Sequence, residues 1–426
     1  MDSNTTIAEH GQFWLSENED KKLRGTLYIN EVNEATLETL GSLIEPNEGG
    51  SHTILGQVGS KQDWVTLIDC FPTKTETLLG GAQTDWSHQT CVVNLVLIGI
   101  CFERGEEIAF ERASITISTL PKWAVPKLVR REFGNGKARP NRGNILIEDR
   151  ADETATVNLR REKIKISIVF RPKEKWEHRG AITRYQVEDN CYLTIERSDG
   201  SKMTLESISS IVRAMQDLLS ICCNETSIVA SFSVYHEQGE RNPVKVYVRM
   251  WGNDVERKQG RPYAALSLND LGGMEGVARW IEVRERYGAA AALLTSNWYN
   301  EKAYNEDKFS RMYTAVEGMV ARKQQCDTAQ MKVSKLAAFV EEAIPGFSSI
   351  VDQNPREWAK EAKGIRDKQV SHLDPINTVV LDGRKLRLMT NILYIAGASF
   401  LLREIGVSEN QVEGYIEDCS KSVQLS

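Results

Sequence analysis

The sequence predicts an α+β protein in which a β-rich N-terminal region precedes an all-α C-terminal helical bundle. Residues 11–251 contain recurring short segments of β-branched and aromatic residues, and many alternate apolar with polar positions. That alternation is typical of antiparallel sheets with one solvated face. From about Asp270 onward, apolar residues recur at helical spacing instead. A length of 426 residues favours two or three domains.

The N-terminal region, residues 1–268, is predicted to be a sandwich or a pair of packed β-subdomains, divided near residue 150. One helix, Leu205–Cys222, is set among its strands because Leu205, Ile208, Met215 and Leu219 form one apolar stripe. The strongest strand patterns lie at Thr26–Ile29, Trp64–Ile68, Val92–Phe102, Ile115–Ile117, Ile164–Phe170, Tyr192–Ile195, Ile228–Tyr235 and Val244–Val248.

The C-terminal part is predicted to consist of a connecting helix, residues 269–298, and a helical domain, residues 299–426. Asn269 and Asp270 can cap the connecting helix, which runs towards Ala292. Short connections between antiparallel helices are typical of a bundle. The bundle helices are expected at Phe309–Lys323, Ala329–Ala343, Asn354–His372 and Leu386–Phe400, the last of them closed at Gly406.

Composition excludes several classes of function. The net charge is −6 and the pI about 5.8, so no global positive field attracts nucleic acid, and an RNA contact would need a local basic patch. The apolar stretch after Arg387 has about fifteen residues, fewer than the ~20 that span a bilayer. The first residues lack the basic and apolar segments of a signal peptide. We therefore expect a cytoplasmic protein without a membrane partner.

No pattern in the sequence indicates a metal or another cofactor. The eight cysteines contain no CxxC pair, and several lie in apolar runs, so we expect buried, reduced thiols and no zinc site. Glycine clusters at Gly134-Asn135-Gly136 and Gly272-Gly273 lack the spacing of a nucleotide-binding loop. None of the six histidines accompanies a G-x-S-x-G elbow.

A basic segment from Lys122 to Arg142 is the one candidate for RNA binding in the N-terminal region. Trp123 and Phe133 are interleaved with its cations, so the segment could follow a phosphate backbone and stack bases. The same residues could instead form a solvated connection, since glycine and proline are frequent there. The cations are Lys122, Lys127, Arg130, Arg131, Lys137, Arg139 and Arg142.

The helix that begins at Asn354 carries the most specific pattern, because Arg366 and His372 lie near its C-terminal end. Arg366 falls at the edge of the apolar stripe, and Pro375 disfavours helical geometry just before it, so the helix should end near His372. A helix C-terminus favours protonated imidazole, and a fixed guanidinium can hold a phosphate. Together they could supply a proton shuttle and an anion clamp without a metal, although such a pair is more often simply exposed.

The run Arg366-Asp367-Lys368-Gln369-Val370-Ser371-His372 resembles the signature of the HEPN superfamily, an arginine and a polar residue followed after three or four positions by histidine. The preceding helix, Phe309–Lys323, is similar to the first helix of that domain, with Glu317 where many members carry an acid. The order of a β-rich front and a helical tail resembles the ApeA-like branch, which is associated with abortive infection. Asp367 stands where many members have asparagine.

The resemblance implies a metal-independent endoribonuclease that cleaves RNA by attack of the 2′-hydroxyl. Arg366, Asp367 and His372 would be catalytic and Glu317 would support Arg366, either as a simple ion-pair partner or by orienting the guanidinium. It also implies a homodimer through the helical domain and an N-terminal region that senses a phage-derived trigger or restrains the enzyme. The alternative hypothesis is a non-catalytic dimeric scaffold whose β-rich region binds a peptide or glycan.

Overall fold

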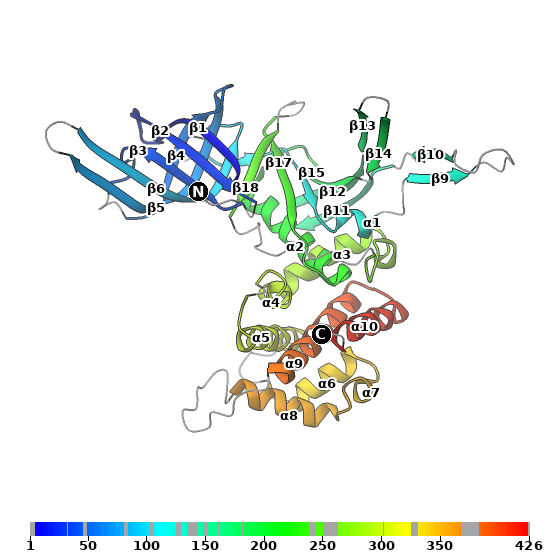
Figure 1. Cartoon of the computed structure of the whole chain (residues 1–426). Helices are drawn as coiled ribbons and strands as arrows, with labels where there is room; N and C mark the ends of the chain where they lie inside the picture. Colours follow the sequence, from blue (N-terminus) through cyan, green and yellow to red (C-terminus); the bar gives the residue numbers. More distant parts are fainter. Residues whose placement is uncertain are drawn as a thin grey trace. The chain divides into compact units, whose positions relative to one another are not determined.

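The computed structural model is an α+β protein with a β-rich N-terminal region and a helical C-terminal region (Figure 1). Contacts between Cα atoms divide it into two compact units: residues 1–118, 192–210 and 228–256 form the first, and the remaining residues form the second. The structure describes residues 5–31, 33–45, 49–80, 84–102, 106–124, 129–133, 143–147, 151–160, 162–171, 173–179, 182–188, 190–237, 243–249, 263–300, 302–324, 331–367 and 383–424.

Six antiparallel strands of the first unit close into a barrel. Their order is β6-β3-β2-β1-β4-β5, and β5 pairs back onto β6, so the ring of hydrogen bonds is continuous. The strands are β1 (Thr5–Leu15), β2 (Asn18–Asn30), β3 (Ala35–Leu40), β4 (His52–Val58), β5 (Asp63–Gly80) and β6 (Thr84–Ile98). The prediction of a sandwich or paired subdomains is therefore wrong for these strands, because alternation reveals a one-sided strand but not which strands close on each other.

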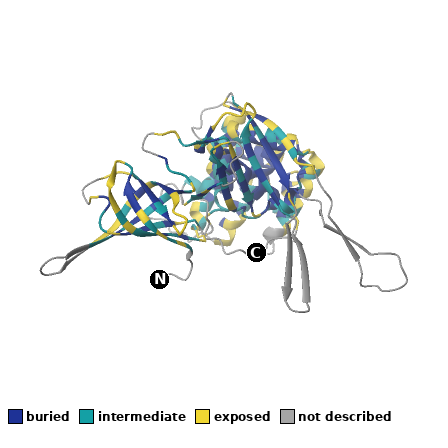
Figure 2. Ribbon diagram, turned by 90° about the horizontal axis from the view of Figure 1, so that it is seen from above, coloured by how far each residue is buried: buried dark blue, intermediate teal, exposed yellow. Residues whose placement is uncertain are grey.

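The barrel interior is filled around Phe13, which is fully buried. Glycines on neighbouring strands make room for it, since a Cβ atom at Gly56 would lie 2.6 Å from the Phe13 ring. At Gly25 a Cβ atom would meet the Glu38 carbonyl oxygen at 2.5 Å. These glycines let the strands bend and approach closely, as a small barrel requires. Buried and exposed residues alternate along the barrel strands (Figure 2).

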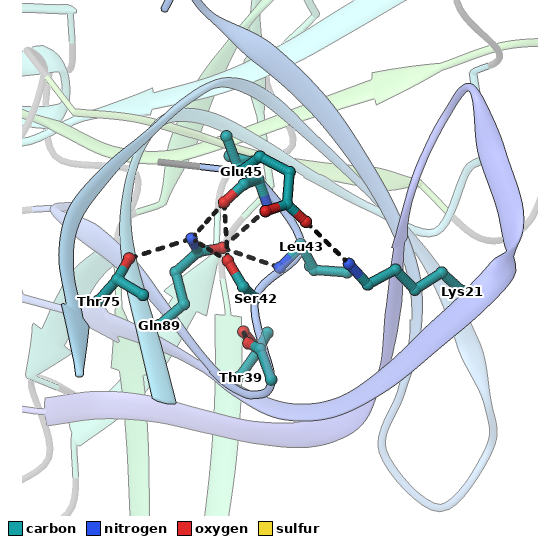
Figure 3. Close-up of polar contacts among 9 residues, drawn as sticks. Lys21, Thr39, Ser42, Leu43, Glu45, Thr75 and Gln89 are labelled. Atoms are coloured by element: carbon teal, nitrogen blue, oxygen red, sulfur yellow. Dashed lines mark hydrogen bonds and ion pairs between the residues drawn. The ribbon is translucent and has the colours of Figure 1, made fainter. Parts of the chain in front are cut away.

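A buried glutamine, Gln89 on β6, ties the loop after β3 to the barrel (Figure 3). Its side-chain oxygen accepts hydrogen bonds from the backbone N–H groups of Leu43 and Ile44, both at 3.0 Å. Its amide nitrogen donates to the Ile44 carbonyl oxygen at 2.7 Å and to the Ser42 hydroxyl at 2.9 Å. Leu43 and Ile44 belong to the barrel core, so this one side chain pairs backbone groups that lie away from water.

Further antiparallel strands extend the sheet from β6, in the order β6-β18-β17-β8-β15. The eight predicted strand segments all overlap observed strands, seven of these in the first unit. The extending strands are β8 (Arg112–Ile117), β15 (Cys191–Arg197), β17 (Val229–Tyr235) and β18 (Val244–Val248), and a small separate pair consists of β7 (Ala109–Phe110) and β16 (Met203–Thr204).

The predicted helix in the β-rich region is confirmed as α2, Leu205–Cys223, and the boundary between the two units falls within it. The second unit also contains α1 (Leu120–Ala124) and three hairpins of antiparallel strands. These hairpins are β9 (Val129–Phe133) with β10 (Gly143–Ile147), β11 (Glu153–Leu159) with β12 (Glu162–Phe170), and β13 (Lys173–Arg179) with β14 (Ile182–Glu188).

A run of helices completes the second unit. The predicted connecting helix is divided by Gly288, whose φ of 49° lies in the left-handed region, so one helix becomes two. The helices are α3 (Met274–Tyr287), α4 (Ala289–Ser296), α5 (Asn305–Lys323), α6 (Val333–Ala343), α7 (Phe347–Val351), α8 (Pro355–Ile365), α9 (Gly383–Glu404) and α10 (Glu409–Gln424), preceded by the short 3-10 turn η1 (Asn269–Leu271). The predicted domain boundaries near residues 150, 268 and 298 stay predictions.

Helix α9 lies at the centre of the helical packing, where it contacts α5, α6 and α10 (Figure 1). Gly397 allows close approach, since a Cβ atom there would lie 2.6 Å from a methyl group of Leu294. A buried polar group links α2 to the next helices: Asp217 accepts from Arg284 at 2.8 Å and from the Thr295 hydroxyl at 2.6 Å. In the described part of the chain, no helix is long and apolar enough to span a membrane.

We predict that Gln89→Ala destabilises the barrel by about 3 kcal/mol, because it leaves two buried backbone N–H groups and a buried carbonyl oxygen unpaired. Urea denaturation of the full chain would measure this change in the free energy of unfolding. The matched control is Gln12→Ala, an exposed glutamine on β1, for which a change below about 0.5 kcal/mol is expected. Equal stability of the two variants would contradict the role of the buried amide.

Candidate functional site

Helix α8 places Arg366 by burying one face. Its predicted N-cap is confirmed, since the Asn354 side chain accepts a hydrogen bond from the Arg356 N–H at 2.9 Å and Pro355 occupies the first helical position. Trp358 is fully buried and packs edge-on against Phe347, with ring centroids 5.5 Å apart. Ala359, Ala362 and Ile365 complete the buried stripe.

Arg366 immediately follows α8 and still has helical backbone angles, with φ −55° and ψ −50°. Its side chain is one-third exposed, as expected for a residue at the border of the buried stripe. His372 and the predicted helix end lie outside the described residues. The convergence of the Arg366 guanidinium and the His372 imidazole therefore stays a prediction.

Helix α5 supplies the surface against which Arg366 rests. Arg366 Nη2 lies 3.7 Å from Glu317 Oε2, and the guanidinium carbon is 5.8 Å from the centre of the Tyr313 ring. Glu317 is itself anchored, because its Oε1 accepts a hydrogen bond from the Met331 N–H at 3.2 Å and its side chain is only 14% exposed. The structure thus pairs Glu317 with Arg366, a contact that both sequence interpretations of Glu317 allow.

Asp367 joins the same cluster from the other side. Its Oδ1 accepts a hydrogen bond from Arg366 Nη1 at 3.0 Å, and its Oδ2 lies 2.8 Å from Lys363 Nζ. Partial burial opposes ionisation, but the bonds from Lys363 and Arg366 outweigh it and lower the pKa of the Asp367 carboxyl. Sequence reasoning missed Lys363, although its i,i+4 spacing from Asp367 on a helix was a signal for this ion pair.

The surroundings keep Arg366 charged. Partial burial lowers the pKa of the guanidinium, but the hydrogen bond that it donates to Asp367 and the charges of Glu317 and Asp367 raise that pKa by more. Tyr313 is buried beneath the guanidinium, and its hydroxyl has no hydrogen-bond partner among the described residues. Burial, followed by the charge of Glu317, raises the pKa of Tyr313 well above its usual value, so the hydroxyl stays protonated.

The cluster of Lys363, Arg366, Glu317 and Asp367 contains two cations and two anions. A guanidinium held on one side by the largely buried carboxylate of Glu317 and open on another is suited to binding an anion such as a phosphate group. No group of three or more potential metal ligands occurs among the residues that the structure describes.

Of the residues named in the basic segment, the structure describes the side chains of Lys122 and Trp123. Lys122 lies on α1, is 17% exposed and forms an ion pair with Glu225 at 2.5 Å. Trp123 is buried, so it is packed in the fold and cannot stack a base. Strand β9 contains Arg130 and Arg131, of which the structure describes only the backbone. The other cations lie outside the described residues: Lys127, Lys137, Arg139 and Arg142. RNA binding by this segment stays a prediction.

A second candidate region is an open groove of about 460 Å³ on the outer face of the barrel. His10 lies in it with Nδ1 2.9 Å from the Thr26 hydroxyl, and His88 Nε2 lies 3.9 Å from Glu38 Oε2. Arg24 also lines the groove. Sequence reasoning missed it, since these side chains come together only when the barrel strands pair.

Six of the seven cysteines that the structure describes are buried, as the sequence predicts, and Cys101 is partly exposed. Burial raises the pKa of the Cys91 thiol to about 11 and that of Cys223 to about 12, which keeps both protonated and unreactive. The seven cysteines in the described part of the chain form no disulfide.

Comparison with known proteins identifies the β-rich region. The sequence model of the family described as ApeA N-terminal domain 1 matches residues 9–273, a range that begins within β1 of the barrel and ends just before α3. No curated protein and no solved structure matches the chain. Arg366, Asp367, His372 and Glu317 all lie beyond the matched range.

We predict that the Asp367 carboxyl titrates below 3.8, the ordinary value, in the folded protein. Because its pKa is lowered, the contribution of the ionised group to folding is present above the ordinary pKa and is lost as the pH falls through the folded-state pKa. Carbon NMR of side-chain carboxyls would follow the titration.

In Lys363→Ala the midpoint should move up towards 3.8, since one of the two cations is removed, whereas Lys360→Ala on the exposed face of α8 should leave it unchanged. A wild-type midpoint at or above 3.8 would show that the two cations do not hold the carboxylate in solution.

Proposed function

The chain belongs to the family defined by the ApeA N-terminal domain 1, and from this premise we propose that it is a metal-independent endoribonuclease of anti-phage defence. Family membership indicates the defence role. The ribonuclease activity rests on the HEPN-like motif from Arg366 to His372. The observation that carries it is the Arg366 guanidinium, which is charged, partly exposed and positioned by Glu317 from the neighbouring helix.

RNA carries its own nucleophile, because each 2′-hydroxyl lies beside the phosphate that it attacks. The protein must then remove the 2′ proton, stabilise charge on the phosphoryl oxygens and protonate the leaving 5′-oxygen. In this proposal His372 moves the protons and Arg366 stabilises the phosphoryl oxygens. Glu317 holds the Arg366 guanidinium in place, and Asp367 orients this guanidinium before RNA binds. The products carry a 2′,3′-cyclic phosphate and a 5′-hydroxyl.

The position of Arg366 suits this role for a physical reason. A guanidinium in contact with Glu317 on α5 and Tyr313 beneath it loses little freedom when a phosphate binds. Its remaining side faces solvent, from which a substrate could approach. A fully buried guanidinium could not reach RNA, and a fully exposed one would not be fixed.

One motif supplies a single guanidinium and a single imidazole, so we propose that two chains face each other through their helical domains and combine two motifs in one site. The β-rich region, with its closed barrel and open outer groove, is proposed to sense a phage-derived trigger or to restrain the enzyme until one appears.

The activity is tested by incubating the purified chain with total RNA in EDTA, with and without lysate of phage-infected cells. Wild type should cleave, and His372→Ala and Arg366→Ala should each reduce the rate by at least about 10²-fold, the usual contribution of a positioned acid–base group. Arg356→Ala, on the exposed face of the same helix, should cleave like wild type.

End-group analysis separates this reaction from metal-dependent hydrolysis, because only 2′-hydroxyl attack leaves a cyclic phosphate. Absence of cleavage under every condition would favour the non-catalytic scaffold. Cleavage that survives both substitutions would assign the activity elsewhere.

Dimerisation is tested separately. Light scattering of the full chain should give twice the monomer mass of 48.0 kDa. A monomer that nevertheless cleaves RNA would overturn the composite site but not the ribonuclease itself.

A further inference from the structure

The two oxygens of the Asp367 carboxylate are each held by a different cation. Arg366 Nη1 donates to Oδ1 at 3.0 Å, and Lys363 Nζ lies 2.8 Å from Oδ2. Two cations that converge on the two oxygens of one anion form the arrangement that also binds the two non-bridging oxygens of a phosphodiester. In the structure this anion is supplied by the chain itself.

Of the two carboxylates that touch Arg366, only Asp367 is free to leave. Glu317 is only 14% exposed and its carboxylate is anchored by the Met331 N–H, so moving it away from Arg366 would leave a largely desolvated charge unpaired. Asp367 is 36% exposed, and the cations that hold it are partly exposed as well, Lys363 at 26% and Arg366 at 33%. Ion pairs between partly exposed side chains contribute little, because water screens them and replaces them readily.

We propose that Lys363 and Arg366 together bind one phosphate group of RNA, at the position that the Asp367 carboxylate occupies in the unbound protein. This inference rests on the proposed ribonuclease function and assigns two roles that the motif does not. Lys363 is a second phosphate-binding residue, and Asp367 is an internal competitor of the substrate.

The charges around the site explain how exchange would occur. With Asp367 in place, the charges of Lys363 and Arg366 are balanced by those of Asp367 and Glu317. When Asp367 rotates towards solvent, Glu317 alone remains and the pocket carries one net positive charge for the incoming phosphate. The lowered pKa of Asp367 shows that it is ionised near neutral pH, so it competes as an anion. The affinity for RNA therefore depends on how much more strongly Lys363 and Arg366 bind the RNA phosphate than the Asp367 carboxylate.

The competing explanation is structural. An i,i+4 pair such as Lys363 with Asp367 can simply stabilise the end of a helix. The two explanations predict different effects of removing the Asp367 charge. If the pair is structural, the protein becomes less stable and its affinity for RNA does not increase. If Asp367 competes with RNA, the affinity for RNA increases.

The test measures binding of a short, labelled single-stranded RNA to the full chain by fluorescence anisotropy, with His372→Ala in every protein so that the RNA stays intact. Lys363→Ala and Lys363→Gln should each weaken binding about tenfold, which corresponds to about 1.4 kcal/mol. The slope of log affinity against log salt should become shallower by about 0.7, the value for one phosphate contact on a single strand. Lys360→Ala, on the exposed face of α8, should do neither.

Asp367→Asn should strengthen binding several-fold at low salt, because the amide keeps the size of the side chain but not its charge. Asp352→Asn, an exposed aspartate in the turn before α8, is the matched control and should leave affinity unchanged. Circular dichroism melting checks that each variant is folded.

The inference is overturned if Lys363→Ala binds RNA like Lys360→Ala, if Asp367→Asn binds more weakly than its parent, or if no protein in the series binds RNA. The proposed function fails in a different way. One outcome is that RNA binds tightly and the Lys363 and Asp367 substitutions change its affinity as expected, but the chain with His372 intact does not cleave RNA. That outcome would support the phosphate site and contradict the ribonuclease activity. If that chain cleaves RNA but substitution of Lys363 does not change RNA affinity, the ribonuclease activity is supported and the phosphate site is contradicted.

Discussion

The burial of one face of α8 is the constraint on which the candidate site depends. Trp358 and its apolar neighbours fix the rotation of this helix, and Arg366 then emerges at the border between core and solvent. At that border a guanidinium can touch Glu317 and Tyr313 on α5 while one side stays open. A rotation of α8 by one residue, about 100°, would bury the charge or carry it away from α5. Apolar packing therefore determines the electrostatics of the site.

The site holds its charges in balance rather than in excess. Glu317 is largely but not fully buried and is anchored by a backbone N–H, while Asp367 is more exposed and held by side chains. In the proposed exchange, this difference in exposure makes Glu317 the fixed support and Asp367 the exchangeable anion. Such a balanced cluster fits a protein with an acidic sequence, since RNA affinity would come from a few placed cations and not from the overall field.

In the β-rich region the main constraint is the pairing of strand edges and of buried backbone groups. By closing six strands into a ring, the chain leaves no unpaired edge within that ring. The loop after β3 brings backbone N–H groups into the interior, and Gln89 satisfies them with a single side chain. The same strand pairing places His10, Arg24 and His88 together on the outer surface, where a ligand could reach them. The closed barrel and its outer groove are the features on which the proposed sensing role depends.

The sequence by itself determined the local structure: the predicted strands, helix α2 and the capped start of α8 all follow from residue periodicity, which reflects which side of each element meets water. The edge of the apolar stripe identified the place of Arg366, and the resemblance of the motif gave its pairing with Glu317 as one option. Only the tertiary structure decided that strands β1–β6 close into a barrel and that Gly288 divides one predicted helix. It also decided that Trp123 is buried and that Lys363 and Arg366 both contact the Asp367 carboxylate. Those features depend on pairing between distant segments and on backbone angles at single residues. A one-dimensional pattern of apolar and polar residues carries neither.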